Sequence, residues 1–323
     1  GFEGCRGRPE ELDPDTGERF AADAVQRGGG WELRTDLPAI GSRLFLLPKR
    51  KAGRPPAKRK AMKRVRSQAL NPKRWNVALS EANNLVLDRP AYRIGSGAWR
   101  GSEEVLRVDM AVREALGIPP RGGRMVQPWA REKKKRPKSV PVTLRYTFDA
   151  KTIPTGDCFL AIEQPQTFQI QVNGADLDVD ADAGWWCDRS LRRIPLDPAL
   201  LRAGTNELTL VCDYAEDHPG LEIVYLLGQF GTKVQGTDVT LTEAPATLRV
   251  GDWCKQGLAF YSGSVSYSRT IRPKLRRGER LFVEVPDYRG VGVRVLVDGV
   301  SAGVAAWDPQ EVEITDLVKG RGE

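Results

Sequence analysis

Histidine and cysteine are scarce in this 323-residue sequence, and long hydrophobic runs are missing. The single histidine, His218, excludes a metal site held by several histidines and any mechanism that needs two of them. A Ser-His-Asp site would have to use His218 within Asp217-His218-Pro219-Gly220, and no nucleophile motif accompanies it. Apolar runs such as Leu44 to Leu47 are far too short to span a membrane.

The five cysteines are scattered, without a Cys-x-x-Cys pair. This spacing does not favour a zinc ribbon, and an odd number of widely spaced cysteines is not typical of a disulfide scaffold. We therefore expect small apolar core residues at all five positions, which are Cys5, Cys158, Cys187, Cys212 and Cys254.

Basic charge is concentrated in one segment. The chain holds 50 lysines and arginines against 42 aspartates and glutamates, for a formal net charge of +8. Residues 49–74 contain twelve of the basic residues and no acid. The rest of the chain therefore has a formal net charge of −4, since 8 − 12 = −4. Because the segment is also rich in Pro, Gly and Ala, it is typical of a linker or exposed loop.

An alternative role for residues 49–74 is nucleic-acid binding. Basic runs bind phosphate backbones, and Gly53-Arg54-Pro55 resembles the core of a minor-groove-binding hook. One short basic run outside a basic fold nevertheless favours the linker interpretation. The same interpretation applies to the second basic run, Arg131 to Lys138, which lies in a proline-bounded loop.

The first part of the chain predicts short strands and one helix. Strands are expected at residues 31–34 and 43–47, and residues 1–48 are interpreted as the closing strands of a preceding domain. Two more strands are expected at 75–79 and 84–87. The helix is predicted over Glu103 to Leu116, ends at Gly117 and has an apolar stripe of Val105, Leu106, Met110, Val112 and Leu116.

From Val142 onward the pattern is nearly all β-strand. Alternating apolar residues predict strands at 142–148, 168–172 and 208–212. Turn sequences such as Asn173-Gly174 and Asp298-Gly299 separate the strands. Short strands at regular spacing with hairpin turns favour a β-sandwich.

An internal repeat indicates two sandwiches in tandem. Tyr146, Asn173-Gly174, the pair Trp185-Trp186 and Gly204 recur as Tyr267, Asp298-Gly299, Trp307 and Gly320. We expect a first sandwich over 75–236, with a helical insertion near 103–116, and a second over 237–323. The second copy stops before an equivalent of the strand 208–212, so we expect a truncated second sandwich and a fragment of a larger protein.

Four stretches carry a family resemblance. Residues 295–303 and 312–320 resemble the sugar-binding-domain pattern of family 2 glycoside hydrolases, in which an Asn/Asp-Gly turn precedes an "(F/I)-D-I-T-x-L-L-K-x-G-x-N" tail. Residues 253–263 are similar to a motif of large α-L-rhamnosidase-like glycoside hydrolases, and 121–129 are similar more loosely. The resemblance spans roughly residues 66–323. It implies galactose-binding-like jelly rolls that flank a catalytic (β/α) barrel.

No such barrel is encoded here, because strands and helices do not alternate over the ~250 residues it needs. No carboxylate pair can be singled out for glycoside hydrolysis either. The resemblance therefore implies a non-catalytic region that packs on the catalytic domain of the same parent chain, binds carbohydrate, or both. The alternative is that this region contributes pocket residues to a glycosidase active site completed by a missing barrel. The parent protein is expected to be secreted or periplasmic.

Aromatic and neighbouring polar residues are the candidate carbohydrate contacts, because aromatic rings stack on the apolar face of a pyranose. Adjacent tryptophans on a strand point to opposite faces, so one of Trp185 and Trp186 is expected to be exposed. The alternative for every aromatic in the set is packing in a core or a domain interface. The candidates are Trp185, Trp186, Asp188, Trp253, Gln256, Tyr261 and Trp307.

Alternating aspartates form the candidate metal site, and calcium is the metal that they suit. Asp178, Asp180 and Asp182 belong to the run Asp176-x-Asp178-x-Asp180-x-Asp182-x-Gly184. An EF-hand-type loop needs its glycine one position earlier and a bidentate glutamate that is missing here. The favoured interpretation is a solvated acidic face, with no cofactor.

Overall fold

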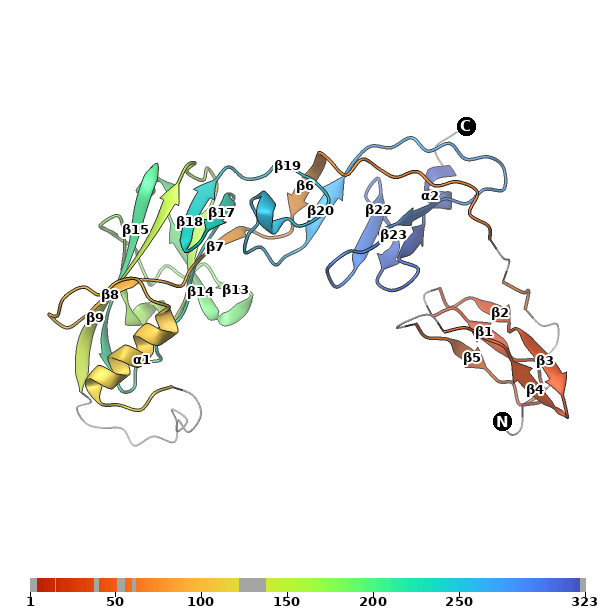
Figure 1. Cartoon of the computed structure of the whole chain (residues 1–323), viewed down its shortest axis with the longest axis horizontal. Helices are drawn as coiled ribbons and strands as arrows, with labels where there is room; N and C mark the ends of the chain where they lie inside the picture. The colour runs from red at the N-terminus through yellow and green to blue at the C-terminus, as the bar shows by residue number, and fades with distance from the viewer. Residues whose placement is uncertain are drawn as a thin grey trace. The chain divides into compact units, whose positions relative to one another are not determined.

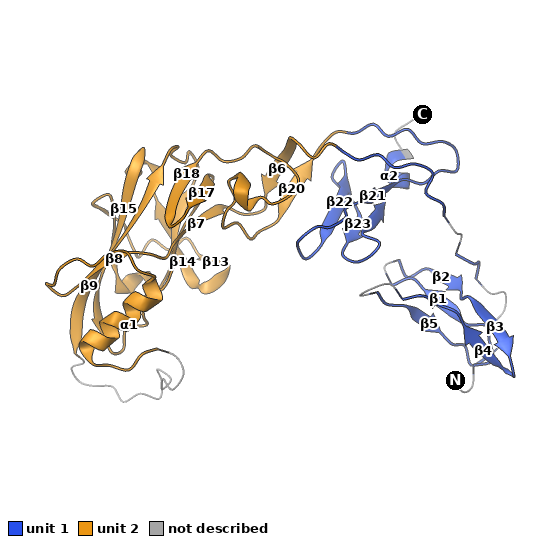
Figure 2. Ribbon diagram, in the orientation of Figure 1, with its two compact units in different colours: residues 1–70, 271–323 blue, residues 71–270 orange. Residues whose placement is uncertain are grey.

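The computed structural model of this chain describes residues 5–14, 16–37, 41–50, 56–59, 62–121 and 138–319. Gly53-Arg54-Pro55, most of the basic run 131–138 and most of the stretch 121–129 lie outside these residues. The described chain is mostly β-strand (Figure 1). It forms two compact units, one of residues 1–70 and 271–323 and the other of residues 71–270 (Figure 2).

The unit of residues 71–270 contains a β-sandwich, as the alternating pattern predicts. Its seven-stranded sheet has the order β12-β11-β15-β9-β18-β17, with β8 paired to β9, and its five-stranded sheet has the order β13-β14-β10-β16-β7. The strands are β7 (Asn83–Leu87), β8 (Ala91–Ile94), β9 (Ser139–Ala150), β10 (Cys158–Glu163), β11 (Gln169–Val172), β12 (Ala175–Asp176), β13 (Trp185–Trp186), β14 (Asp188–Leu196), β15 (Gly204–Ala215), β16 (Val224–Gly228), β17 (Gly231–Gln235) and β18 (Asp238–Thr242).

One core joins the two sheets. Leu144, Tyr146 and Leu210 of the seven-stranded sheet are in the same buried cluster as Leu160 and Leu226 of the five-stranded sheet. The pairing of β9 with β15 runs along the whole of both strands, from Ser139 opposite Ala215 to Ala150 opposite Gly204. The predicted strands at 142–148, 168–172 and 208–212 are therefore confirmed, and their alternate residues build the core.

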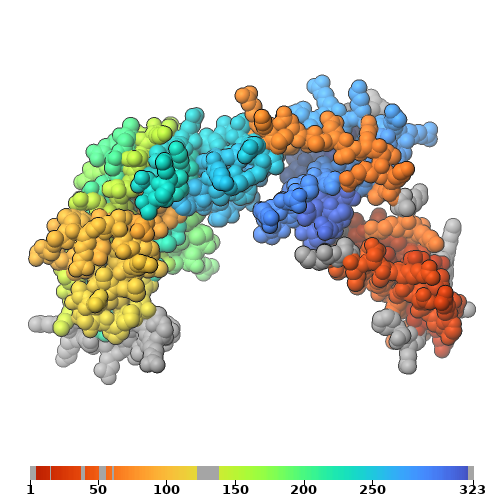
Figure 3. Space-filling model, in the orientation of Figure 1, coloured from red at the N-terminus to blue at the C-terminus, as the bar shows by residue number. Residues whose placement is uncertain are grey.

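The predicted helix is present as α1 (Val105–Leu116), with Glu104 as N-cap and Gly117 in the left-handed conformation at its end. Its inward stripe differs from the prediction. Val105, Val108 and Val112 are buried, whereas Leu106 and Met110 are exposed. Asp109 and Arg113 take the remaining inward positions. Their buried polar groups are hydrogen-bonded, to each other and to Tyr214 and the Pro119 carbonyl. In Figure 3, α1 (yellow) forms part of the sandwich surface.

Only two cysteines fulfil the expectation of a core role. Cys158 and Cys212 are buried, and burial raises the pKa of their thiols to about 11 and about 12. Cys187 and Cys254 are exposed and Cys5 is half-buried, which corrects the prediction. Cys187 sits in the tight connection between β13 and β14, and Cys254 in a 3-10 turn, so neither faces the core.

The sandwich extends beyond the expected boundary at residue 236. That boundary falls inside the β17–β18 hairpin, and β18 pairs in parallel with β9 of the seven-stranded sheet. The strand around Tyr267, β20 (Val265–Ser268), also belongs to the unit of residues 71–270. It forms a three-stranded sheet with β6 (Trp75–Leu79) and β19 (Thr247–Leu248). Long-range pairing thus joins β18 to β9 and β20 to β6, both of which come earlier in the sequence.

The C-terminal part of the other unit has a small core. Strand β21 (Phe282–Glu284) pairs with β24 (Glu311–Glu313) in one two-stranded sheet, and β22 (Val293–Val297) forms a hairpin with β23 (Val300–Ala305) in another. A short helix, α2 (Thr315–Lys319), follows and was not predicted. The buried residues of the core are Val295, Ala305, Val312 and Ile314.

The N-terminal segment forms more strands than predicted. The expected strands at 31–34 and 43–47 correspond to β4 (Gly30–Leu33) and β5 (Leu44–Leu46). Three short polar strands were missed, because none has an apolar alternation long enough to detect. They are β1 (Glu10–Leu12), β2 (Arg19–Ala21) and β3 (Ala24–Arg27).

Arginines of the basic segment are held by acidic residues from elsewhere in their unit. Arg59 pairs with Asp13 at 2.6 Å, Arg64 with Glu284 at 3.1 Å and Arg66 with Glu279 at 2.9 Å. Residues 64–66, which precede the sandwich in sequence, therefore lie beside residues 279–284, which follow the sandwich. None of the helices among the described residues is long and apolar enough to cross a membrane.

Candidate carbohydrate-binding site

The β13–β14 hairpin carries the first group of predicted site residues. In its register Trp185 lies opposite Arg192 and Trp186 opposite Asp188, with a bulge between the two tryptophans. Cys187 connects the strands with a φ of 47°, in the left-handed region. This tight turn brings Asp188 back beside the tryptophan pair.

The two tryptophans differ in exposure. Trp185 is 50% exposed. Trp186 is half-buried, with its ring centroid 5.0 Å from that of Tyr225 on the neighbouring β16. The indole nitrogen of Trp186 is buried and has no hydrogen-bond partner among the described residues. Trp186 therefore anchors the hairpin on the outer face of the five-stranded sheet, and Trp185 keeps a ring free for a ligand.

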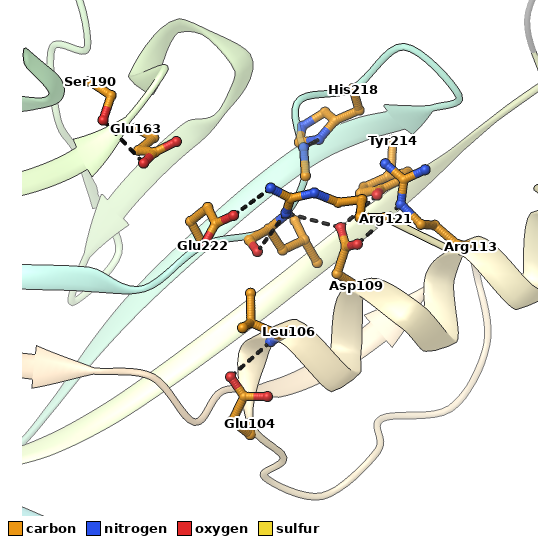
Figure 4. A network of polar contacts seen from close by, with 12 residues as sticks. Glu104, Leu106, Asp109, Arg113, Arg121, Glu163, Ser190, Tyr214, His218 and Glu222 are labelled. Carbon is orange, nitrogen blue, oxygen red and sulfur yellow. Dashed lines mark hydrogen bonds and ion pairs between the residues drawn. The ribbon is translucent and has the colours of Figure 1, made fainter. Parts of the chain in front are cut away.

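Polar side chains lie on the second strand of the hairpin and on the adjoining strand β10. The Asp188 Oδ1 atom accepts hydrogen bonds from the Ser190 backbone N–H and from the Ser190 hydroxyl, both at 2.8 Å. The same hydroxyl lies 3.2 Å from Glu163 Oε1 on β10, as Figure 4 shows. Because the hydroxyl has one proton, it serves one carboxylate at a time and leaves acceptor capacity on both.

This arrangement suits binding better than hydrolysis. The hydrogen bonds from the Ser190 backbone and hydroxyl lower the pKa of Asp188 below its ordinary value. A glycosidase acid needs a carboxyl whose pKa is raised, so Asp188 is a poor proton donor. As an anion it is a good acceptor for sugar hydroxyls. The exposed Trp185 ring on the same hairpin is the kind of apolar surface that a pyranose face can cover.

Trp253, Gln256 and Tyr261 form a separate structural cluster. The Trp253 and Tyr261 rings meet edge to face at 6.4 Å, and Tyr261 is buried. The Tyr261 hydroxyl donates to the Ser264 carbonyl at 2.9 Å and accepts from the Ser80 backbone N–H at 3.1 Å. These contacts correspond to the packing alternative, because the tyrosine is already satisfied inside the protein.

Gln256 is occupied in the same way. Its side-chain oxygen accepts from the Arg249 N–H at 2.8 Å, and its side-chain nitrogen donates to the Arg249 carbonyl at 3.0 Å and the Asp252 carbonyl at 2.9 Å. The amide thus closes the loop 249–256. Trp307 is 52% exposed and belongs to the other unit, that of residues 1–70 and 271–323.

The candidate calcium ligands make local contacts instead. Asp178 Oδ1 accepts from the Asp180 backbone N–H at 3.0 Å, and Asp182 accepts from the Gly184 N–H and pairs with Arg192. All three aspartates are exposed, which agrees with the solvated acidic face. Across the residues that the structure describes, no three His, Cys, Asp or Glu side chains are placed to hold a metal ion together.

Comparison with known proteins gives a distant structural neighbour. No family model matches the chain, and a search of curated proteins finds no match. Among solved structures, the rhamnosidase from Novosphingobium sp. PP1Y is 16% identical over 67% of this chain, with a TM-score of 0.20. The match covers 17% of the rhamnosidase chain. At that TM-score the function of this chain has to be inferred from its own residues.

A buried polar network that the sequence did not predict surrounds the single histidine (Figure 4). Asp109 Oδ1 accepts from the Tyr214 hydroxyl at 2.6 Å and from the Leu221 N–H at 3.0 Å, and Asp109 Oδ2 accepts from Arg113 at 3.1 Å. The His218 ring stacks on Tyr214 at 4.5 Å. The i, i+4 spacing of Asp109 and Arg113 beside Val105, Val108 and Val112 is the signal that could have revealed it.

His218 is neutral in this network. Burial, as the largest cause, lowers its pKa to about 4. Its Nδ1 atom accepts from the Gly220 N–H at 3.0 Å, so the proton is on Nε2. No carboxylate orients the ring through Nδ1, as a catalytic histidine requires. The network therefore fixes α1 against β15 and the loop 216–221 and has a structural role.

Proposed function

We propose that this chain is a non-catalytic, carbohydrate-binding β-sandwich region of a glycoside hydrolase, with the β13–β14 hairpin as its sugar contact. The observation that carries the proposal is the half-exposed Trp185 ring on a hairpin whose second strand carries Asp188 and Ser190, with Glu163 on the adjoining strand β10. A sugar ring would cover the indole while its hydroxyls donate to the two carboxylates. The resemblance of residues 295–303 and 312–320 to the sugar-binding-domain pattern of family 2 glycoside hydrolases supports the same ligand class.

The test is calorimetric titration of the full chain with neutral mono- and disaccharides. We expect a Kd of about 1 mM and a loss of at least about tenfold in Trp185→Ala, because a stacking ring is removed. Trp307→Ala is the matched control, since Trp307 is 52% exposed against 50% for Trp185. Equal affinity of Trp185→Ala and the wild type would overturn the assignment to the hairpin.

The second part of the proposal is that this region packs on a catalytic domain of the same parent chain. Its role in the complete protein is then either substrate binding alone or a contribution to the active-site pocket. In the complete protein, the alternative role in a shared glycosidase pocket predicts a loss of hydrolysis in Trp185→Ala, whereas this chain alone hydrolyses nothing. A purely binding role predicts that Trp185→Ala weakens attachment to polymeric substrate and leaves the hydrolysis of a small soluble glycoside unchanged. The two substrates therefore separate the roles.

Nucleic-acid binding is less well supported than carbohydrate binding. Arg59, Arg64 and Arg66 of the basic segment form ion pairs with acidic residues, which reduces the charge available for phosphates.

A further inference from the structure

A second surface of the sandwich has the shape and chemistry of a ligand site. An open groove of about 670 Å³ lies beside β11 and β12, between the turn at 166–168 and the ends of β9 and β15. That volume falls within the range of small-molecule sites, about 300–1,000 Å³. The residues that line the groove include none from the tryptophan hairpin, which consists of β13 and β14.

The lining of the groove is amphipathic. Leu177 and Val179 are half-buried and supply apolar surface, while Phe168 and Ile170 also line the groove but are buried. All four pack in or against the sandwich core. Their positions are therefore fixed by the fold. Gln169, Asp176 and Asp213 supply polar groups from β11, β12 and β15.

The Asp176 carboxylate is held in place by two side-chain amides. Gln169 Nε2 donates to Asp176 Oδ1 at 3.0 Å and Gln171 Nε2 donates to the same oxygen at 2.9 Å. These two bonds lower the pKa of Asp176, so the group is anionic at neutral pH. Because the carboxylate is exposed, it can accept further hydrogen bonds from a ligand. Because the carboxylate is already oriented, less conformational entropy is lost when a ligand binds to it.

The charge of the groove selects against anions. Asp176 and Asp213 are both acidic, and the described lining includes no lysine, arginine or histidine. Apolar surface flanked by fixed acceptors matches a neutral sugar, which has a C–H face and several hydroxyl donors. We propose that this groove binds a neutral sugar of mono- or disaccharide size, as a site separate from the hairpin. The ligand class rests on the proposed function, and the location rests on the groove itself.

The test uses nitrogen-labelled full-length chain and nuclear magnetic resonance. The side-chain amide signals of Gln169 and Gln171 report on the groove during titration with methyl α-D-glucopyranoside, methyl α-L-rhamnopyranoside and cellobiose. We expect both signals to shift with a saturable, millimolar-range dependence for at least one sugar. Sodium glucuronate should bind at least about tenfold more weakly than the neutral glucoside, because of the two carboxylates.

Matched variants separate the groove from the hairpin. Asp176→Ala should weaken the groove response at least about tenfold, and Asp180→Ala, an exposed aspartate outside the lining, should leave it unchanged. The remaining signals of each variant show that it is folded. Trp185→Ala should keep the groove response.

Unshifted Gln169 and Gln171 signals, or equal responses in Asp176→Ala and Asp180→Ala, would overturn the groove site. If sugar binding then persists and is lost in Trp185→Ala, the proposed function stands without the groove. If no sugar binds the wild-type chain at all, both proposals fail.

Discussion

The two copies of the internal repeat share a turn and differ in what surrounds it. Asn173-Gly174 has φ values of 51° and 86°, and Asp298-Gly299 has φ values of 49° and 87°. The first turn lies in a seven-stranded sheet over a large core, whereas the second joins β22 to β23 in a two-stranded sheet over a small one. Two residues determine the turn, but distant strands determine the size of the sheet.

Side-chain bonds explain how the first turn is tied to its sheet. The Asn173 side-chain nitrogen donates to the Leu200 carbonyl at 2.8 Å and to Asn206 Oδ1 at 2.9 Å, and its oxygen accepts from the Glu207 N–H at 3.0 Å. The turn is thus fastened to the start of β15. Asp298 has no amide to donate, so the second turn cannot make the same set of bonds.

The largest expected difference between the copies is in core packing. Ile170 and Ile314 are both buried, one in the large core and one in the small core. Ile170→Ala should cost about 2–5 kcal/mol, because the surrounding sheet cannot collapse onto the cavity. Ile314→Ala should cost about 2 kcal/mol or less, since a small open core relaxes more easily. Amide hydrogen exchange in β15 and in β24 measures each cost separately. Equal costs would contradict the contrast.

A smaller effect should be the same in both copies. A Cβ added at Gly174 or Gly299 would meet no atom within 4 Å, so only the left-handed backbone opposes an alanine. Gly174→Ala and Gly299→Ala should each cost about 1–2 kcal/mol. Hydrogen exchange in the flanking strands measures both. Unequal losses would show that the two turns are not equivalent.

The last effect concerns pH and only the first copy, because His218 is the only histidine in the chain. Its pKa falls from 6.5 to about 4 on folding, so the unfolded chain binds the proton more readily. Stability is therefore complete above pH 6.5 and decreases as the pH drops towards 4. Between pH 7 and pH 5 we expect a loss of about 2 kcal/mol in urea unfolding of the sandwich.

His218→Gln is the control for that experiment. The variant keeps an acceptor near Gly220 but has no titrating ring, so it should lose less stability over the same interval. A wild-type protein with the same stability at pH 7 and pH 5 would contradict the neutral, buried state of His218.

Local patterns predicted the sandwich well, because alternation and turns depend on neighbouring residues. They failed where pairing is long-range, as with β18, which joins β9 in parallel, and β20, which joins β6. They also failed for the Asp109 network, because the i, i+4 spacing of Asp109 and Arg113 indicates a pair on one helix face but not the distant partners Tyr214 and Leu221. For the candidate site, the sequence predicted that one tryptophan of the pair is exposed, and Trp185 is 50% exposed, but the contact of Trp186 with Tyr225 depends on the neighbouring strand β16. The structural roles of Gln256 and Tyr261 depend on contacts with Arg249 and Ser80, which the sequence did not reveal.

The most direct test of the carbohydrate-binding proposal is the indole N–H signal of Trp185 in the labelled chain during titration with a neutral sugar. Assignment comes from the signal that disappears in Trp185→Ala. We predict that this signal shifts saturably, while that of Trp307, an equally exposed tryptophan, stays in place. A Trp185 signal that does not move at sugar concentrations well above millimolar would contradict binding at the hairpin.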